Sequence, residues 1–217
     1  TRMLRWVSVA PNGRSVVFQA LGHLYVRKLP DGRPKRLTRD KNVFEFYPSF
    51  SRDGKYIVYT TWSDEKLGSV RIVSASGGRS RSLATGPGHY IEPVFSPDSR
   101  SVIYRKIAGG YLVSKLWSRS PDLYQIPIRG GSPSQLHLKG SQPHFGADPN
   151  LLFYQSAAAK HQHLLKSLDL KTGRQKTWAT SKAATAFRVS PNGRFLAFQE
   201  GYKTYVAPFP KTGRKIR

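Results

Sequence analysis

The sequence contains no cysteine and no long apolar run. The absence of cysteine excludes disulfide scaffolds, cysteine-ligated zinc sites and thiol catalysis, and it suits a reducing or an oxidising compartment equally. The longest apolar stretches, such as residues 151–154, cover only a few positions, whereas a membrane-spanning helix needs about 20. A helical membrane protein is therefore excluded.

Acidic residues are also scarce. The 217 residues include 12 Asp and Glu against 36 Lys and Arg, which gives a formal net charge of +24. Aromatic residues make up 12% of the chain, too many for a typical disordered protein. The composition therefore predicts a folded, strongly basic protein with few carboxylates for acid–base chemistry.

Five segments of the chain share one pattern, a short strand that ends in Ser-Pro-Asp-Gly or a variant of it. In such a turn Pro presets φ, Asp or Asn hydrogen-bonds its own backbone, and Gly takes a positive φ. Successive turns are 41, 45, 50 and 44 residues apart, a spacing typical of propeller blades. The turn residues are Asn12, Asp53, Asp98, Asp148 and Asn192.

Each turn leads into a β-branched and aromatic run such as 56–59, then a third strand and a short outer strand. The chain is therefore predicted to be all-β: a β-propeller of four-stranded antiparallel blades, with about five repeats that form a whole ring or part of a larger one. A β-sandwich with accidental turn similarity is the alternative. We expect a single domain over 1–217, and its blades cover about 5–38, 47–84, 92–138, 142–178 and, incompletely, 186–217.

The Pro-x-Phe-Ser-Pro-Asp-Gly-Lys pattern, the Gly-Gly turns and the Arg-x-Leu-Thr ending resemble the TolB-type propeller repeats. Strings such as Glu45-Phe46-Tyr47-Pro48 and 87–93 resemble the amino-terminal TolB-like propeller of long bacterial secreted amidohydrolases. The resemblance implies an extracytoplasmic, periplasmic or secreted, location. It also implies further blades before this stretch and a metal-dependent barrel after it. The fourth repeat departs from the pattern, with Gly146-Ala147-Asp148-Pro149, and is expected to keep the turn chemistry.

Signals for catalysis are weak. His161 and His163 have a two-histidine metal spacing, but a surface loop is the favoured interpretation because no barrel supplies further ligands. No Gly-x-Ser-x-Gly elbow occurs, and Gly77-Gly78 and Gly130-Gly131 are interpreted as hairpin turns. No catalytic residue, metal or cofactor is therefore predicted, and the protein is expected not to be an enzyme.

Loops that lead into the innermost strands of a propeller open on one face. Here they carry a mixture of aromatic and polar residues suited to holding a small or extended ligand. We expect Glu45 and Glu92 to be solvated carboxylates at the channel rim. The predicted ligand-binding residues are Glu45, Tyr47, His89, Tyr90, Glu92, His144 and Arg188.

The basic residues cluster on turns and outer strands, where they would rim the disc. They either protect the edge strands from pairing with other sheets or form a surface for a polyanion such as an acidic polysaccharide, lipopolysaccharide or nucleic acid. No base-stacking motif or DNA-reading helix is present, which argues against sequence-specific nucleic-acid binding. The predicted polyanion rim contains Arg33, Lys35, Arg36, Arg79 and Arg81.

The favoured function is that of a non-catalytic, extracytoplasmic scaffold that binds a protein, a peptide or another ligand. Two alternatives remain open. The chain is the propeller portion of an amidohydrolase, with a fused hydrolase domain as its partner, or it binds polyanions by charge alone.

Overall fold

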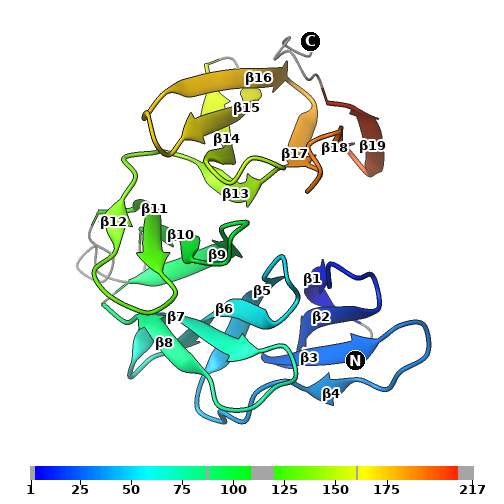
Figure 1. The fold of residues 1–217 in the computed structure, drawn as a ribbon, viewed down its shortest axis with the longest axis vertical. Helices are drawn as coiled ribbons and strands as arrows, with labels where there is room; N and C mark the ends of the chain where they lie inside the picture. The colour runs from blue at the N-terminus through cyan, green and yellow to red at the C-terminus, as the bar shows by residue number, and fades with distance from the viewer. Residues whose placement is uncertain (1–2, 87, 109–119, 160, 210–217) are drawn as a thin grey trace. The chain divides into compact units, whose positions relative to one another are not determined.

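The computed structural model describes residues 3–86, 88–108, 120–159 and 161–209 (Figure 1). Within these ranges every regular element is a β-strand, and no helix occurs. The chain divides into two compact units, unit 1 over residues 1–137 and unit 2 over residues 138–217.

Unit 1 contains three antiparallel sheets of four strands, each formed by consecutive strands paired in chain order. This is the strand order of a propeller blade, in which strands that neighbour in the sheet are also consecutive in the chain. The three blades are β1 (Arg5–Val9), β2 (Ser15–Ala20), β3 (His23–Lys28) and β4 (Lys35–Arg36); β5 (Phe44–Phe50), β6 (Tyr56–Ser63), β7 (Leu67–Ser74) and β8 (Arg81–Ala84); and β9 (His89–Phe95), β10 (Ser101–Ile107), β11 (Asp122–Pro127) and β12 (Ser134–Gln135).

Unit 2 contains a fourth blade and three strands of a fifth among its described residues. The predicted all-β fold of four-stranded antiparallel propeller blades is therefore confirmed. The strands are β13 (Ser141–Phe145), β14 (Leu151–Ala158), β15 (Gln162–Asp169) and β16 (Gln175–Ser181), followed by β17 (Ala184–Val189), β18 (Phe195–Glu200) and β19 (Lys203–Pro208).

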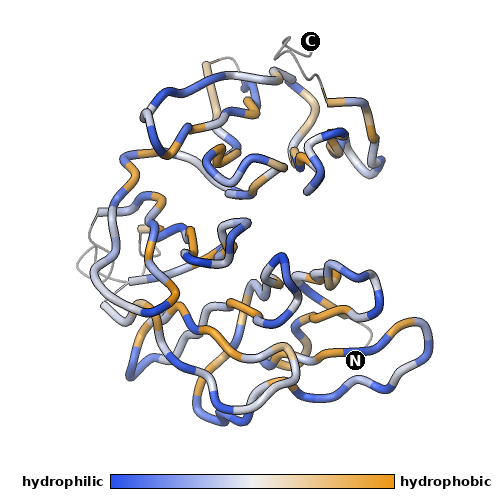
Figure 2. The backbone as a smooth tube through the Cα atoms, viewed as in Figure 1, coloured by the Kyte–Doolittle hydropathy of each residue, from blue (hydrophilic) through white to orange (hydrophobic). Residues whose placement is uncertain are grey.

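The hydrophobic clusters of unit 1 lie between neighbouring blades. Along the chain, hydrophobic stretches alternate with hydrophilic ones (Figure 2). Strand β6 shows how one strand serves two interfaces. Ile57 and Tyr59 pack in a cluster with Val17 and Leu24 of the first blade, whereas Val58 packs in a cluster with residues of the third blade. Successive side chains of a strand point to opposite faces, so β6 is buried on both sides, as its uninterrupted apolar run predicts.

The repeated turns have the predicted chemistry in four of the five blades. The residue after the turn Asn or Asp has a positive φ, 68° at Gly13, 71° at Gly54, 55° at Ser99 and 67° at Gly193. Its N–H donates to the carbonyl three residues earlier, at Ala10, Ser51, Ser96 and Ser190. The turn Asn or Asp also accepts, through Oδ1, the N–H two residues later.

The turn of the fourth blade differs, and the prediction that it keeps the full turn chemistry is wrong. Pro149 stands at the glycine position, where it has no N–H to donate. Only the side-chain bond survives, since the Asn150 N–H still donates to Asp148 Oδ1 at 2.8 Å. The backbone bond is replaced by one from the Leu151 N–H to the Asp148 carbonyl at 3.3 Å.

Replacing Gly54 with Ala should destabilise the second blade. A Cβ at Gly54 would have Pro11 Cδ as its nearest neighbour at 3.7 Å, so the cost is the positive φ and not a clash. Gly86 is the matched control, because its φ lies outside the left-handed region. Urea unfolding should place Gly54→Ala about 1–2 kcal/mol below Gly86→Ala in stability. Equal stabilities would show that the turn tolerates a side chain at this φ.

Candidate functional site

A strained bulge recurs in the innermost strand of four blades. The bulged residue lies six positions before the turn Asn or Asp and has a positive φ although it is not glycine. At the same place each inner strand shifts its register against the next strand of its blade. This holds for β1, β5, β9 and β13. These residues are Trp6 (φ 49°), Tyr47 (51°), Glu92 (54°) and Gln142 (53°).

The bulges explain why the inner strands start earlier than predicted. Strand β5 begins at Phe44 and β9 at His89, three residues before the expected starts at 47 and 92. A proline inside each strand, Pro48 or Pro93, signals a loop in the sequence. At a bulge, however, one residue leaves the hydrogen-bond ladder, and a proline is accommodated there.

A positive φ at a residue such as Trp6 or Tyr47 costs on the order of 1–3 kcal/mol, and it persists only where the surrounding structure enforces it. A bulge also turns a side chain away from the regular alternation of its strand. The recurrence of both features in consecutive blades therefore makes the inner strands the candidate location for a functional site.

In unit 1 the bulges bring three side chains from three blades toward one place. Strand β1 contacts β5, and β5 contacts β9. The Trp6 ring lies 4.5 Å from the Tyr47 ring, centroid to centroid, and 5.5 Å from the Phe46 ring in an edge-to-face arrangement. Both Trp6 and Tyr47 remain partly exposed, so this aromatic surface is accessible to a ligand.

A charged pair completes the group. Glu92 Oε2 lies 3.6 Å from Arg105 Nε, and the two side chains are 19% and 25% exposed. Arg105 Nε makes no hydrogen bond within the described residues. Burial and then the Glu92 carboxylate raise the pKa of Tyr47, which the Arg105 guanidinium counteracts. We call Trp6, Tyr47, Glu92 and Arg105 the inner-strand cluster.

Of the predicted ligand-binding residues, the structure brings together Tyr47 and Glu92. Trp6 and Arg105 were not predicted. Trp6 has a signal in the sequence, because it stands at the same distance before its turn residue as Tyr47 and Glu92 do. Arg105 has none, since only the pairing of β10 with β9 places it beside Glu92.

Glu45 lies elsewhere, and the prediction that it is a solvated carboxylate at the channel rim is wrong. Its side chain is fully buried. Oε2 accepts the Leu24 N–H at 2.8 Å, and Oε1 accepts the Thr38 hydroxyl. Burial raises the pKa of this carboxyl, which the two hydrogen bonds partly offset. Glu45 therefore fastens the start of β5 to the first blade.

Two further predicted residues, Tyr90 and His89, lie at the start of β9. Tyr90 is a core residue, 5% exposed, and packs edge-to-face on Tyr104 with ring centroids 5.4 Å apart. His89 is partly exposed, lies 5.0 Å from the Trp62 ring, and has a pKa lowered by burial. Neither residue belongs to the inner-strand cluster.

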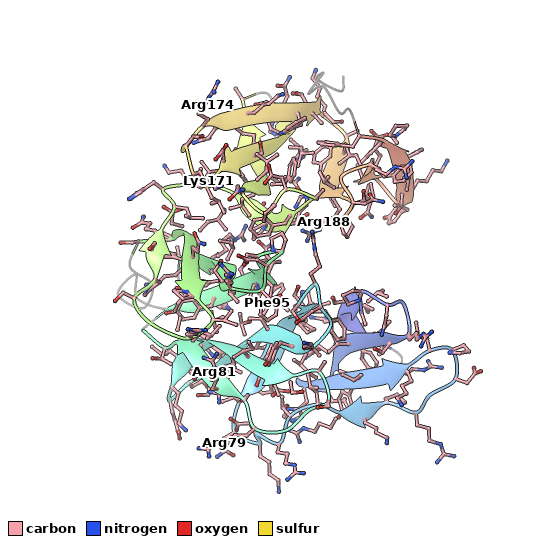
Figure 3. All side chains as sticks on the ribbon, in the orientation of Figure 1. Arg79, Arg81, Phe95, Lys171, Arg174 and Arg188 are labelled. Atoms are coloured by element: carbon pink, nitrogen blue, oxygen red, sulfur yellow. The ribbon has the colours of Figure 1, made fainter. Side chains whose placement is uncertain are left out.

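The last two predicted residues, His144 and Arg188, lie in unit 2, where both bond to backbone groups. His144 is 8% exposed, and its Nε2 accepts the Val189 N–H of the neighbouring blade at 3.0 Å. The Nδ1 therefore carries the proton and donates to the Gln142 carbonyl at 2.9 Å. Burial, and next the Arg188 guanidinium, lower the pKa of His144 to about 3. Arg188, labelled in Figure 3, is exposed and donates to the Gln142 and Pro143 carbonyls.

The predicted polyanion rim is exposed on two outer edges. Strand β4 contains Lys35 and Arg36, and Arg33 lies two residues before it. Arg36 donates to the Asp40 carbonyl, and its Nη2 lies 3.1 Å from His23 Nδ1. Arg79 and Arg81 lie at β8 of the second blade (Figure 3).

The described ranges contain no group of three or more His, Cys, Asp or Glu arranged to hold a metal ion. No helix in the described part of the chain is long and apolar enough to cross a membrane.

Comparison with known proteins finds likeness in structure only. No protein-family model matches the chain, and no curated protein sequence does. A TolB from Acinetobacter baumannii aligns with a TM-score of 0.70 at 20% identity over 94% of this chain and 51% of its own. An oligogalacturonate lyase in complex with manganese aligns with a TM-score of 0.75 at 14% identity over 99% of this chain and 64% of its own. A chain of the nidogen/laminin complex aligns with a TM-score of 0.70 at 14% identity over 99% of this chain and 78% of its own.

These alignments define the class: the chain has the fold of the TolB-type β-propellers, as its repeats predict. It spans about half of the TolB and about two thirds of the lyase. The likeness to amidohydrolase propellers stays a prediction.

Proposed function

We propose that this protein is a non-catalytic, extracytoplasmic binding scaffold that holds a peptide segment of a partner protein on its inner-strand cluster. The observation that carries the proposal is the recurrence of the strained bulge, which turns Trp6, Tyr47 and Glu92 out of their strands at equivalent places. Strain of this kind is retained where it serves binding or chemistry.

The composition of the cluster favours binding over catalysis. Trp6 and Tyr47 offer rigid aromatic surface with a polar edge, the kind of residue that dominates binding energy at protein interfaces. Glu92 and Arg105 supply one charge of each sign to orient polar groups of a peptide. Both side chains of this pair are partly exposed, so a ligand can reach them.

The structural neighbours support either kind of function. A TolB and a protein–protein complex share the fold, and so does a lyase. Fold therefore does not decide activity, whereas the composition of the inner-strand cluster favours binding.

A panel of peptides selected from a displayed random library against the wild-type protein tests the proposal. Trp6→Ala and Tyr47→Ala should each weaken the selected peptides by at least about tenfold, the cost expected when an aromatic anchor is truncated. Arg33→Ser is the matched control, since it is exposed and lies outside the cluster, and it should leave affinity unchanged. Peptides that bind both aromatic variants as well as the wild type would overturn the proposal.

A further inference from the structure

The outer edge of the second blade contains two adjoining cavities that the inner-strand cluster does not involve. The larger, of about 660 Å³, is lined by strands β7 and β8 and by Tyr56 and Ile128. The smaller, of about 440 Å³, extends toward Arg39 and Asp40. Both cavities share Arg71, Arg79 and Ser80 among their lining residues, so they form one continuous groove.

The groove is lined by hydrogen-bond donors. Arg71 donates from Nε to Ser80 Oγ at 3.0 Å and from Nη1 to Ser82 Oγ at 2.9 Å. A guanidinium has five N–H groups in a planar fork, so Arg71 has more donors than these two bonds use, although it also interacts with the buried Tyr59 hydroxyl. Both serines accept from Arg71, which leaves the Ser82 O–H as a donor, whereas Ser80 also interacts with the Tyr59 hydroxyl.

Arg79 and Arg81 add two more guanidinium groups (Figure 3). No carboxylate lines the larger cavity among the described residues. The smaller cavity has one, Asp40, whose Oδ1 accepts the Asn42 N–H at 3.2 Å. A ligand with only acceptors and negative charge therefore matches the groove, whereas a cation or a neutral donor does not.

The groove is held in shape by contacts to both neighbouring blades. Arg81 donates to the Ile128 carbonyl of the third blade. On the other side, the Gly77-Gly78 turn packs on the first blade, where a Cβ at Gly77 would lie 2.8 Å from the Leu37 carbonyl oxygen. Only glycine allows this approach, which fixes the loop that carries Arg79 and Ser80.

We propose that this groove is a binding site for an acidic saccharide, whose carboxylate or sulfate groups contact Arg71, Arg79 and Arg81. A concave groove admits a single polymer chain and excludes the broad surface of a nucleic-acid duplex. Single-stranded nucleic acid needs successive aromatic platforms, and Tyr56 is the one aromatic residue that lines either cavity in the described structure. Tyr56 and Ile128 instead give the groove one apolar wall against which a sugar ring can lie.

The proposal separates the predicted polyanion rim into two sets. Arg79 and Arg81 line the groove, whereas Arg33 and Lys35 are equally exposed but line neither cavity. A site in the groove and a diffuse charge effect therefore predict different results for the two pairs.

Calorimetric titration of the full chain with a heparin-derived hexasaccharide and with hexagalacturonate tests the proposal, and a neutral hexasaccharide serves as blank. Arg79→Ser/Arg81→Ser should weaken the affinity for the acidic saccharide by at least roughly tenfold, the loss expected for a single charged hydrogen bond. The matched double variant Arg33→Ser/Lys35→Ser removes the same charge and should change the affinity less than about twofold, the level of a distant exposed charge.

Arg71→Lys provides a second test, because it keeps the charge and removes the fork. It should also lose roughly tenfold in affinity. Preference for the sulfated or the carboxylated probe identifies the acidic group. Equal losses in the two double variants, no binding of either acid by the wild type, or tighter binding of a single-stranded oligothymidylate would each overturn the proposal.

Discussion

Acidification from pH 6.5 to pH 4.5 is expected to lower the free energy of unfolding of the part of the chain that contains His144. The pKa of this ring is about 3 in the folded protein because it is buried, and next because Arg188 lies beside it. In the unfolded chain the histidine pKa is about 6.5. Between pH 6.5 and pH 3 the unfolded state therefore binds a proton that the folded state does not. The free energy of unfolding decreases by about 1.4 kcal/mol for each unit by which the pH is lowered in this range.

At pH 4.5 the expected loss is about 3 kcal/mol relative to pH values above 6.5, where both states hold the ring neutral. Urea unfolding at several pH values measures it. His144→Gln is the matched variant, because its side-chain oxygen can still accept the Val189 N–H but does not titrate. The difference between wild type and variant should shrink as the pH falls, since the wild type loses this stability and the variant does not. A difference independent of pH would show that the ring is already charged or accessible in the folded state.

Glu45→Leu is expected to destabilise unit 1 by about 4 kcal/mol, because it leaves two buried donors, the Leu24 N–H and the Thr38 hydroxyl, without an acceptor. Glu45→Gln should cost less than about 1 kcal/mol, since its oxygen can still accept the Leu24 N–H, its NH₂ group can donate to the Thr38 hydroxyl oxygen, and no charge is buried.

Chemical unfolding of the two Glu45 variants, followed by circular dichroism, measures this difference. Comparable losses in both variants would show that the shape of the side chain, and not its hydrogen bonds, fastens β5 to the first blade. The same measurement separates Glu45 from Glu92, whose replacement by Gln should change stability little because the pair with Arg105 is partly exposed.

Glu45 and Glu92 show why the site is harder to predict than the fold. Both carboxylates precede an innermost strand, so the sequence suggests one role for both. Glu92 stands six residues before its turn residue, at the bulge, and Glu45 stands eight before. The true counterpart of Glu92 is Tyr47, which also stands six residues before its turn residue. The shifted register of β5 and β9 shows that this shared position is a bulge.

The sequence by itself determined the blade. Its turns depend on residues within one short segment, such as Ser96, Asp98 and Arg100, whose hydrogen bonds close locally. Its strands follow from apolar runs such as 56–59, because a short continuous apolar run by itself indicates a strand that is buried on both faces.

Only the tertiary structure decided which side chains meet. Trp6 and Tyr47 are brought together by the packing of one blade on the next, and Arg71 faces Ser80 and Ser82 because β7 pairs with β8. The bulges were also visible only in the structure, because in the sequence a proline within a strand cannot be told from a proline in a loop. Contacts between blades depend on strand register, and a shift of one residue moves every side chain to the other face. Spacing therefore marks equivalent positions such as Trp6 and Tyr47, but it does not show which side chains meet in the inner-strand cluster or line the outer groove.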